Sequence, residues 1–276
     1  MAEPVAGPVA GRPPGAARDR PRFRRIEKAM GTVFSFDIRG PRARDAWGAV
    51  EDAVRWLHRV DGLFSTYRPD SQLSRLSRGE LSTAECDPLL TEVLLLCDGA
   101  EQLSDGWFSA YHSGLLDPTG LVKGWAVERA SQLLFDAGVT DSCVNGGGDI
   151  QLRGNAAPGR PWRTGISDPL RPGRVLTVVE GEGELAVATS GTAERGCHVI
   201  DPDTGRPPRH PLVAVTVLAA GLTAADAWAT AAFAGGRAAR EWLEGLADVE
   251  AFAVEADGST WRTSGFDRYL AGPRGG

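Results

Sequence analysis

Hydrophobic residues along this chain alternate between the spacing of a strand and the spacing of a helix. A short apolar run over 33–38 is typical of a strand and is followed by glycine and proline. Helical spacing follows over 47–57, and it returns over 89–97 and 121–134. Gly138 is suited to end the last helix, because glycine readily adopts the left-handed backbone found there. The first half is therefore predicted to be a strand followed by three helices.

The second half of the chain is predicted to be rich in β-structure. Runs of β-branched and apolar residues bounded by turn residues predict strands at 142–152, 162–166, 175–179, 185–189 and 213–218. A helix is expected over 223–233, and the Asp257-Gly258 turn signal predicts a C-terminal hairpin. Interleaved elements with hairpin-like connections favour a mixed α/β (α+β) fold, with largely antiparallel sheets flanked by helices, over a regular doubly wound sheet.

The first 25 residues differ in composition from the rest of the chain. They hold six arginines against two acidic residues, and five prolines among glycine and alanine. Such a segment cannot bury enough apolar surface to offset its ordering entropy. Residues 1–25 are therefore predicted to be a disordered basic tail, and residues 26–270 a single domain. The sequence shows neither a secretory signal nor a run of membrane-spanning length, which predicts a cytoplasmic protein without a membrane anchor.

Composition and charge exclude several classes of function. With 42% hydrophobic and 24% charged residues, the 276-residue chain is typical of a soluble globular protein. A net charge of −6 argues against a broad nucleic-acid interface. The four cysteines include no C-x-x-C pair, so they indicate reduced structural residues rather than a zinc site or a redox dithiol.

Two segments are candidates for binding a phosphorylated ligand. The run 145–149 holds three glycines, whose backbone N–H groups could approach a phosphate or a ribityl chain, although a tight turn is the common alternative. The run 117–125 places a carboxylate, a hydroxyl and an ammonium at the start of a helix, where anions are favoured. Lys123 could meet a phosphate there. Alternatively, Asp117 or Thr119 caps the helix and Lys123 is solvated.

Three further residues carry candidate chemistry. Thr223 to Asp226 matches the [ST]-x-x-[DE] capping box, and a cap is the simpler account of Asp226. Thr230 lies one turn further on and shares a helix face with Asp226, so the two side chains also offer hard oxygen ligands suited to magnesium. The intrinsic pKa of His198 suits it to accept a proton from a hydroxyl, although a lone histidine beside a turn is more often structural.

In their order along the chain, a series of short segments resembles the FAD:protein FMN transferase family. The segments span about residues 26–236 and are 30–32, 65–71, 117–125, 145–149, 162–166, 189–191, 198–205 and 223–230. Such an ordered series is far more specific than any single glycine run. The resemblance implies a flavin-transferase-like fold and an enzyme that transfers the FMN half of its substrate FAD to a Ser or Thr hydroxyl of an acceptor protein, with release of AMP.

The same resemblance implies roles for individual residues. Magnesium would be held by the side chains of Asp226 and Thr230 and by the backbone carbonyl of Gly120, at the FAD pyrophosphate. His198 would receive the proton of the acceptor hydroxyl, and the acceptor would be a redox protein with a Ser/Thr flavinylation motif. The FAD site would be lined by Met30, Tyr67, Trp107, Asp117, Lys123 and Ile200.

The sequence departs from the family in two respects. Many relatives are exported, often as lipoproteins, whereas this sequence has no export signal or lipidation cysteine near its start, which implies a cytoplasmic form. Relatives commonly show an aromatic residue followed by Asp-Pro where this chain has Trp107-Phe108-Ser109, so part of the FAD contact set differs. Two alternatives stay open: a flavin-binding protein without transferase activity, and an FAD pyrophosphatase that gives FMN and AMP.

Overall fold

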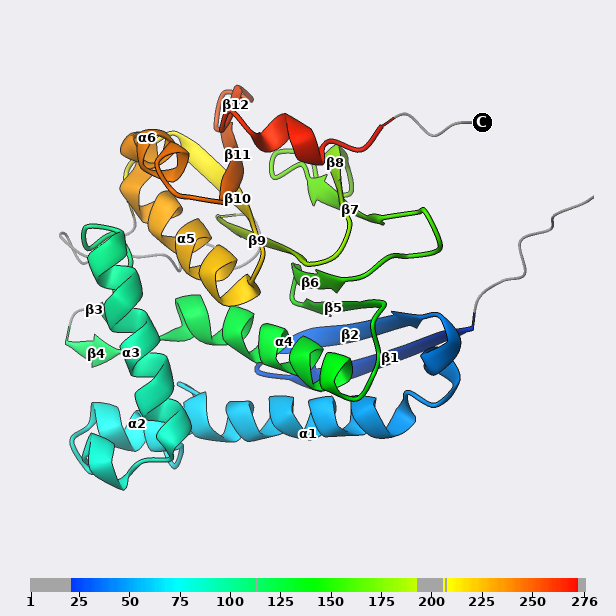
Figure 1. The fold of residues 1–276 in the computed structure, drawn as a ribbon. Coiled ribbons are helices and arrows are strands. Elements are labelled where there is room, and N and C mark those ends of the chain that lie inside the picture. Colours follow the sequence, from blue (N-terminus) through cyan, green and yellow to red (C-terminus); the bar gives the residue numbers. More distant parts are fainter. Residues whose placement is uncertain (1–20, 113, 193–205, 207, 273–276) are drawn as a thin grey trace, which may run out of the picture.

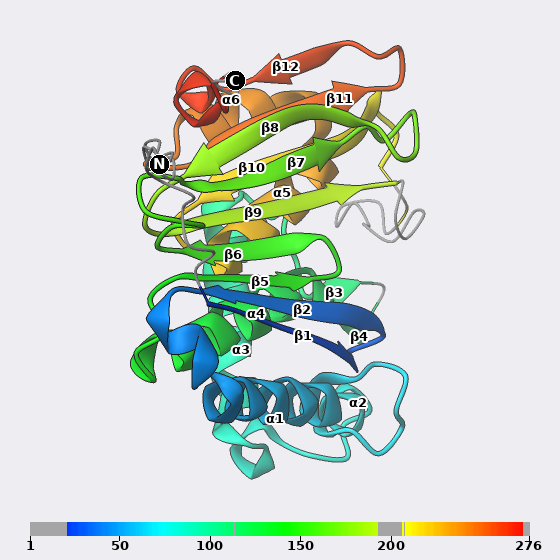
Figure 2. The same ribbon diagram turned by 90° about the vertical axis from the view of Figure 1, so that its right-hand side faces the viewer.

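A twisted sheet of eight strands forms the centre of the fold (Figures 1 and 2). The computed structural model describes residues 21–112, 114–192, 206 and 208–272. Every pair of neighbouring strands in the sheet is antiparallel. In spatial order the strands are β1 (Arg22–Ala29), β2 (Thr32–Arg39), β5 (Ser142–Gly146), β6 (Asp149–Arg153), β9 (Leu185–Gly191), β10 (Leu212–Ala219), β11 (Glu250–Glu255) and β12 (Thr260–Arg262).

Helices cover one face of this sheet, and a separate hairpin covers part of the other (Figures 1 and 2). The hairpin consists of β7 (Trp162–Ser167) and β8 (Val175–Gly181), and a second small hairpin of β3 (Tyr111–His112) and β4 (Leu115–Leu116). The α-helices are α1 (Trp47–Phe64), α2 (Gln72–Ser77), α3 (Pro88–Leu103), α4 (Thr119–Asp136), α5 (Leu222–Gly235) and α6 (Ala239–Glu244). Four short 3-10 turns, Pro41–Arg44, Thr83–Glu85, Gly236–Ala238 and Phe266–Tyr269, complete the described elements. The predicted mixed fold with largely antiparallel sheets is confirmed.

The alternation of side chains along the inner strands produces two hydrophobic cores. In β9, Ala186 and Ala188 belong to the core beneath the helices, whereas Leu185 and Val187 belong to the core beneath the β7–β8 hairpin. The same division holds in β11, where alanines face the helices and Phe252 faces the hairpin. Because successive residues of a strand point to opposite faces, a strand that is buried on both faces needs a nearly continuous apolar sequence.

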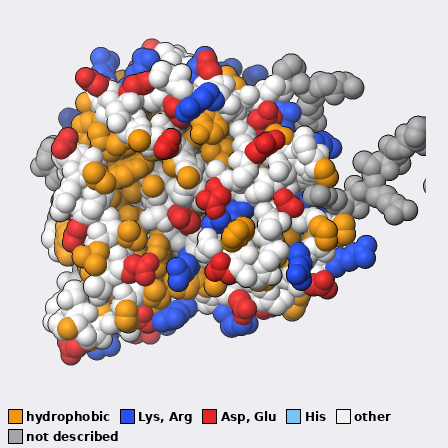
Figure 3. All heavy atoms as spheres, viewed as in Figure 1, with side chains coloured by type: hydrophobic (Ala, Val, Ile, Leu, Met, Phe, Trp, Pro, Cys, Tyr) orange, Lys and Arg blue, Asp and Glu red, His pale blue; other side chains and the backbone are white. Residues whose placement is uncertain are grey.

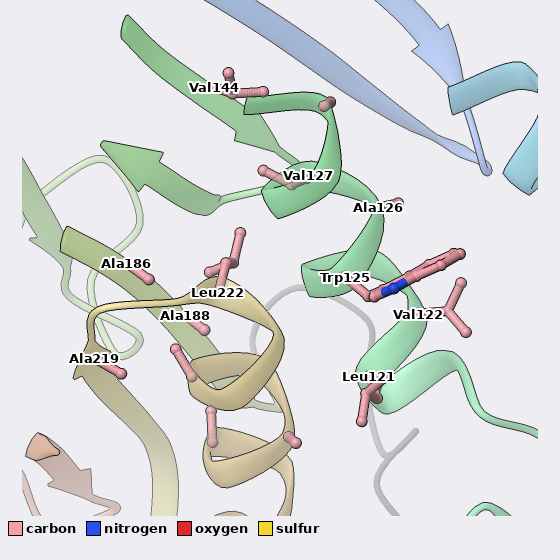
Figure 4. Close-up of a cluster of buried hydrophobic side chains, with 14 of the residues drawn as sticks. Leu121, Val122, Trp125, Ala126, Val127, Val144, Ala186, Ala188, Ala219 and Leu222 are labelled. Carbon is pink, nitrogen blue, oxygen red and sulfur yellow. The ribbon is translucent and has the colours of Figure 1, made fainter. Parts of the chain in front are cut away.

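Helix α5 packs closely on the sheet because both contact surfaces consist mainly of alanine. Its residues are apolar nearly all round, as expected for a helix buried between a sheet and a neighbouring helix. Figure 4 shows Ala186 and Ala188 of β9 and Ala219 at the end of β10 beside this helix, with Leu222 pointing toward α4. Small side chains let α5 approach both β9 and α4, and this packing brings the polar residues of α4 and α5 together.

Strand β1 begins inside the segment predicted to be a disordered tail. Arg22 donates to Asp37 of β2 through Nε at 2.9 Å, and the Phe23 ring packs edge-on against Trp47 at 6.0 Å between centroids. Arg22 and Arg24 thus lie beside the Asp37 carboxylate once the strand pairs with β2. Strand β1 therefore begins before position 26, and residues 1–20 lie outside the described residues.

The single strand predicted over 142–152 consists of two strands. Gly147 and Gly148 adopt positive φ angles of 61° and 100° and connect β5 to β6 as a two-residue hairpin turn. A side chain at Gly147 would also lie 2.7 Å from the Thr32 hydroxyl. The alternative of a tight turn is therefore correct for this glycine run, and the turn also borders the cavity described next.

Candidate functional site

One cavity of about 490 Å³ lies where α4, α5, β9, the β5–β6 turn and the β7–β8 loop meet. This volume is within the range of pockets that bind small molecules. Six of the residues predicted for the FAD or magnesium site line it: Trp107, Asp117, Gly120, Lys123, Asp226 and Thr230. They come from three segments of the chain that the packing of α4 against α5 brings together.

The polar centre of the cavity is a lysine between two buried carboxylates. The ammonium of Lys123 lies 3.3 Å from Asp226 Oδ1 and also forms an ion pair with Asp149 Oδ2. The Lys123 side chain is 14% exposed, and the two carboxylate side chains are only 3% and 4% exposed. The other oxygens of the carboxylates are hydrogen-bonded as well, because Asp149 Oδ1 accepts the N–H of Thr189 at 3.0 Å and Asp226 Oδ2 accepts that of Gly124 at 2.8 Å.

Asp226 does not cap its own helix, so the simpler account of this residue is wrong. Helix α5 begins at Leu222 with Gly221 as its N-cap, which places Asp226 beyond the position that a capping box requires. The first N–H groups of α5 are accepted by distant side chains instead. Gln151 Oε1 accepts the N–H of Leu222 at 2.9 Å, and Glu128 Oε2 accepts that of the next residue at 2.7 Å. These contacts leave Asp226 free to face α4.

Close contact between α4 and α5 depends on glycine at position 124. A Cβ atom there would lie 2.5 Å from the Leu222 carbonyl oxygen and 2.6 Å from Asp226 Cβ. The Gly124 N–H, which in a regular helix pairs with the carbonyl of Gly120, donates to Asp226. Glycine at 124 therefore allows the Asp226 carboxylate to reach the backbone of the neighbouring helix.

Three neutral oxygens lie beside this charged cluster. Thr230 Oγ1 donates to the Gly120 carbonyl at 3.3 Å and is the same distance from Ser190 Oγ. A side chain at Gly120 would lie 3.1 Å from Thr230 Cγ2, so glycine there also permits a close approach. One carboxylate and a few neutral oxygens make a set of hard donors. Within the part of the chain that the structure describes, no three His, Cys, Asp or Glu side chains form a metal cluster.

Asp117 stabilises the start of α4. Its Oδ1 atom accepts the N–H of Thr119 at 3.0 Å, but the N-cap residue is Pro118, so the alternative that Asp117 or Thr119 is the N-cap is wrong. Asp117 and the first turn of α4 both line the cavity. Lys123 is mostly buried rather than solvated, so the alternative that it is a surface residue is wrong.

Comparison with known proteins identifies the family. The family model described as the ApbE family matches residues 30–115 and 111–253. The chain belongs to the ApbE family. A Salmonella typhimurium protein named FAD:protein FMN transferase is 34% identical over 310 aligned positions, which cover 88% of each chain. An Escherichia coli K12 protein of the same name is 29% identical with the same coverage. The resemblance seen in the ordered motifs is thus confirmed.

Solved structures of ApbE proteins share the fold of this chain. The flavin transferase ApbE from Vibrio cholerae superimposes with a TM-score of 0.77 at 23% identity, and the alignment covers 91% of this chain and 100% of that one. The ApbE protein of Thermotoga maritima gives a TM-score of 0.76 at 21% identity, again with 91% and 100% coverage. The antiparallel sheet flanked by helices is therefore the architecture of ApbE proteins.

Two residues expected at the FAD site of this ApbE chain do not line the cavity, so their predicted roles stay predictions. Met30 occupies the β1–β2 turn with a φ of 49° and packs against the core, and Tyr67 is 94% exposed. Neither is among the described residues that line the cavity. His198 and Ile200 lie outside the described residues, so their predicted roles stay predictions.

Trp107 connects the cavity to a cluster of aromatic residues. Its ring packs edge-on against Trp242 at 5.6 Å between centroids, and Trp242 packs in turn against Trp228 at 5.5 Å. On the face drawn in Figure 3, hydrophobic side chains gather over the region of α5 and α6, which carry Trp228 and Trp242. This cluster fixes the Trp107 ring at the cavity wall.

Two cavity residues were not predicted as site residues. Asp149 ends the glycine run. Its position at the start of a strand, directly after two turn glycines, is the sequence feature that could have identified it as a site residue. Ser190, from the segment 189–191 of the family series, lies beside Thr230. Separately, none of the described helices has the length and apolar character needed to cross a membrane.

Proposed function

We propose that this protein uses magnesium to transfer the FMN half of FAD to a Ser or Thr hydroxyl of an acceptor protein, and that AMP is released. The observation that carries the proposal is the single cavity in which a lysine, two buried carboxylates and three neutral oxygens meet. Relatives named FAD:protein FMN transferase that align with most of the chain support the same reaction.

The donors around Asp226 suit magnesium. Asp226 would provide the charged ligand, and the Thr230 hydroxyl and Gly120 carbonyl would provide neutral ones, which leaves positions for water and phosphate oxygens. When bound, magnesium would neutralise charge on the pyrophosphate oxygens as a Lewis acid. The approach of Thr230 to Gly120 in the protein alone supports this assignment, because two of the proposed ligands are already 3.3 Å apart.

The remaining residues of the cavity would orient FAD. In the proposed reaction, the acceptor oxygen forms a bond to the phosphorus of the FMN phosphate, the bond from that phosphorus to the AMP phosphate oxygen breaks, and His198 takes the acceptor proton. Lys123 would meet phosphate oxygens as a point charge, since its ammonium lies at the cavity wall. Catalysis of this kind rests on positioning and electrostatics rather than on covalent chemistry by the protein.

Mass spectrometry tests the proposal directly. The full chain would be incubated with FAD, magnesium chloride and a panel of redox proteins that carry candidate Ser/Thr motifs. We expect one acceptor to gain the mass of a single FMN phosphoester, with one AMP released per modification. No mass gain on any acceptor would reject the transferase, and AMP released together with free FMN would identify the pyrophosphatase instead.

A pair of isosteric variants tests the metal site. Asp226→Asn keeps the shape of the side chain but removes its charge, and we expect turnover at saturating FAD to fall about 100-fold or more. Asp136→Asn is the matched control, because Asp136 lies exposed at the far end of α4. Equal turnover and equal magnesium dependence in both variants would refute the assignment. The predicted cytoplasmic location would be tested separately by fractionating cells that express the chain.

A further inference from the structure

The most unusual feature of the cavity is that one ammonium group forms ion pairs with two buried carboxylates. Lys123 contacts Asp149 Oδ2 and also lies 3.3 Å from Asp226 Oδ1. Both carboxylates are almost fully buried, so water screens these charges little. The cluster therefore carries one negative charge in excess, and Lys123 is the cation beside the proposed metal ligand.

This arrangement creates a competition at Asp226. A metal ion that binds Asp226 must share the carboxylate with an ammonium already within ion-pair distance, or displace it. If Lys123 were held only by Asp226, metal binding would leave the lysine without a partner and would be opposed by its charge. A second carboxylate that holds Lys123 independently removes most of this cost.

Asp149 is well placed to provide that second anchor. Its Oδ1 atom accepts the backbone N–H of Thr189 in β9, so the carboxylate is fixed between two paired strands. It directly follows the β5–β6 turn, whose two glycines adopt positive φ. The side chain of Asp149 is 3% exposed and cannot turn away to solvent without breaking this contact.

We propose that Asp149 is a positioning residue that holds the Lys123 ammonium independently of Asp226, so that a metal ion can displace the ammonium from Asp226 while Lys123 stays at the cavity wall. This inference rests on the proposed function, since it assigns the metal to Asp226. Asp149 itself touches neither metal nor FAD in the proposal. It acts through Lys123, and its removal would let the ammonium move fully onto Asp226.

A double-mutant cycle measured as metal affinity tests the inference. Mn²⁺ is the probe, because its free-ion EPR signal falls on binding and no turnover is needed. The four proteins are the wild type, Asp149→Asn, Lys123→Met and the double variant. Asparagine keeps an oxygen to accept the Thr189 N–H, and methionine keeps the length of the lysine stem. Thermal melts of each protein would establish that it is folded.

We expect Asp149→Asn to weaken Mn²⁺ binding about tenfold more when Lys123 is present than when it is methionine. A residue that acted only through its own charge, or only by shaping the backbone, would weaken binding by the same factor in both backgrounds, and that result would overturn the inference. A crystal structure of metal-free Asp149→Asn gives a second criterion, because the Lys123 ammonium should lie against Asp226. Finding it still beside residue 149 would also overturn the inference.

Two results separate this inference from the proposed function. If the wild type binds no Mn²⁺ and modifies no acceptor, the proposed function fails and the inference fails with it. Only the inference fails if the wild type binds Mn²⁺ and transfers FMN but Asp149→Asn weakens Mn²⁺ binding by the same factor with lysine and with methionine at position 123. Should Asp149→Asn not fold, Asp149→Ser replaces it in the cycle, since it removes the charge but keeps a side-chain oxygen, and the same criterion applies.

Discussion

The contact between α4 and α5 at Gly124 can be tested by adding a single methyl group. A Cβ atom at this position would lie 2.5 Å from the Leu222 carbonyl oxygen, about 0.9 Å short of the 3.4 Å at which ordinary contact begins. The obstructing atom belongs to the backbone, so it cannot rotate away. Gly124→Ala must therefore move α5 away from α4, and the Asp226 carboxylate moves with it.

The expected loss of stability follows from two opposing effects. Overpacking of a buried contact costs about 1–3 kcal/mol. Alanine is favoured over glycine in a helix by about 1 kcal/mol, which offsets part of that cost. Gly99→Ala in α3 is the matched control, because a Cβ at Gly99 meets no atom within 4 Å and only the helix preference applies. Because the helix preference favours both variants equally, they should differ by the overpacking cost alone, about 1–3 kcal/mol, or roughly 2–12 °C in Tm for a domain of this size.

Calorimetry and Mn²⁺ titration together measure both consequences. Gly124→Ala should melt below the wild type or close to it, Gly99→Ala should melt slightly above it, and only Gly124→Ala should lose Mn²⁺ affinity, by about tenfold or more. Equal melting temperatures for the two variants, or a Gly124→Ala protein with wild-type Mn²⁺ affinity, would refute the claim that this contact positions Asp226.

Two further predictions concern groups outside the cavity. Burial raises the pKa of the Cys143 thiol to about 12. At pH 8 only about one molecule in 10,000 therefore carries the thiolate, and a thiol-alkylating reagent should label Cys143 of the folded protein slowly. Rapid labelling of Cys143, measured by mass spectrometry, would contradict this. Hydrogen bonds from Arg59 and a backbone N–H lower the pKa of Asp87 below its ordinary value of 3.8. Ionised Asp87 therefore stabilises the protein at pH values above 3.8, and this contribution is lost as the pH falls through the lowered pKa. The stability advantage of the wild type over Asp87→Asn in urea should therefore shrink below about pH 4, and an advantage that is constant with pH would exclude this role.

Local sequence patterns were sufficient for most of the elements but not for the site. The long helices and the strands of the second half follow from periodicity and turn residues, because those signals are local. Helices α2 and α6 were not predicted, since six residues are too few to show a helical period. Strand β1 was not predicted, because its arginines lie beside carboxylates only after it pairs with β2.

The cavity residues show the same division between local and distant information. Lys123 and Thr230 were candidates from local patterns and from the family motifs. No local pattern indicates that Asp149 and Lys123 meet, because only the packing of α4 against the sheet joins them. For Asp226 the local sequence favours a cap, whereas the family resemblance implies a metal ligand. The cap is replaced by Glu128 and Gln151, which lie far away in the sequence. Reasoning from local sequence therefore fails where a side chain from another element provides the contact.

The charges of the cavity explain why a costly arrangement is kept. Buried ion pairs add little to stability, because desolvation offsets most of their attraction. Two carboxylates against one ammonium leave a single formal negative charge, which on the proposed function would attract a divalent cation. With that cation bound, the site would be positive by one charge, which suits the doubly negative pyrophosphate of FAD. Replacing Lys123 by a neutral residue would abolish this reversal of sign, since the loaded site would then have no positive charge to offer the phosphates. On the proposed function, the lysine is therefore what allows one buried cluster to attract first a metal ion and then an anion.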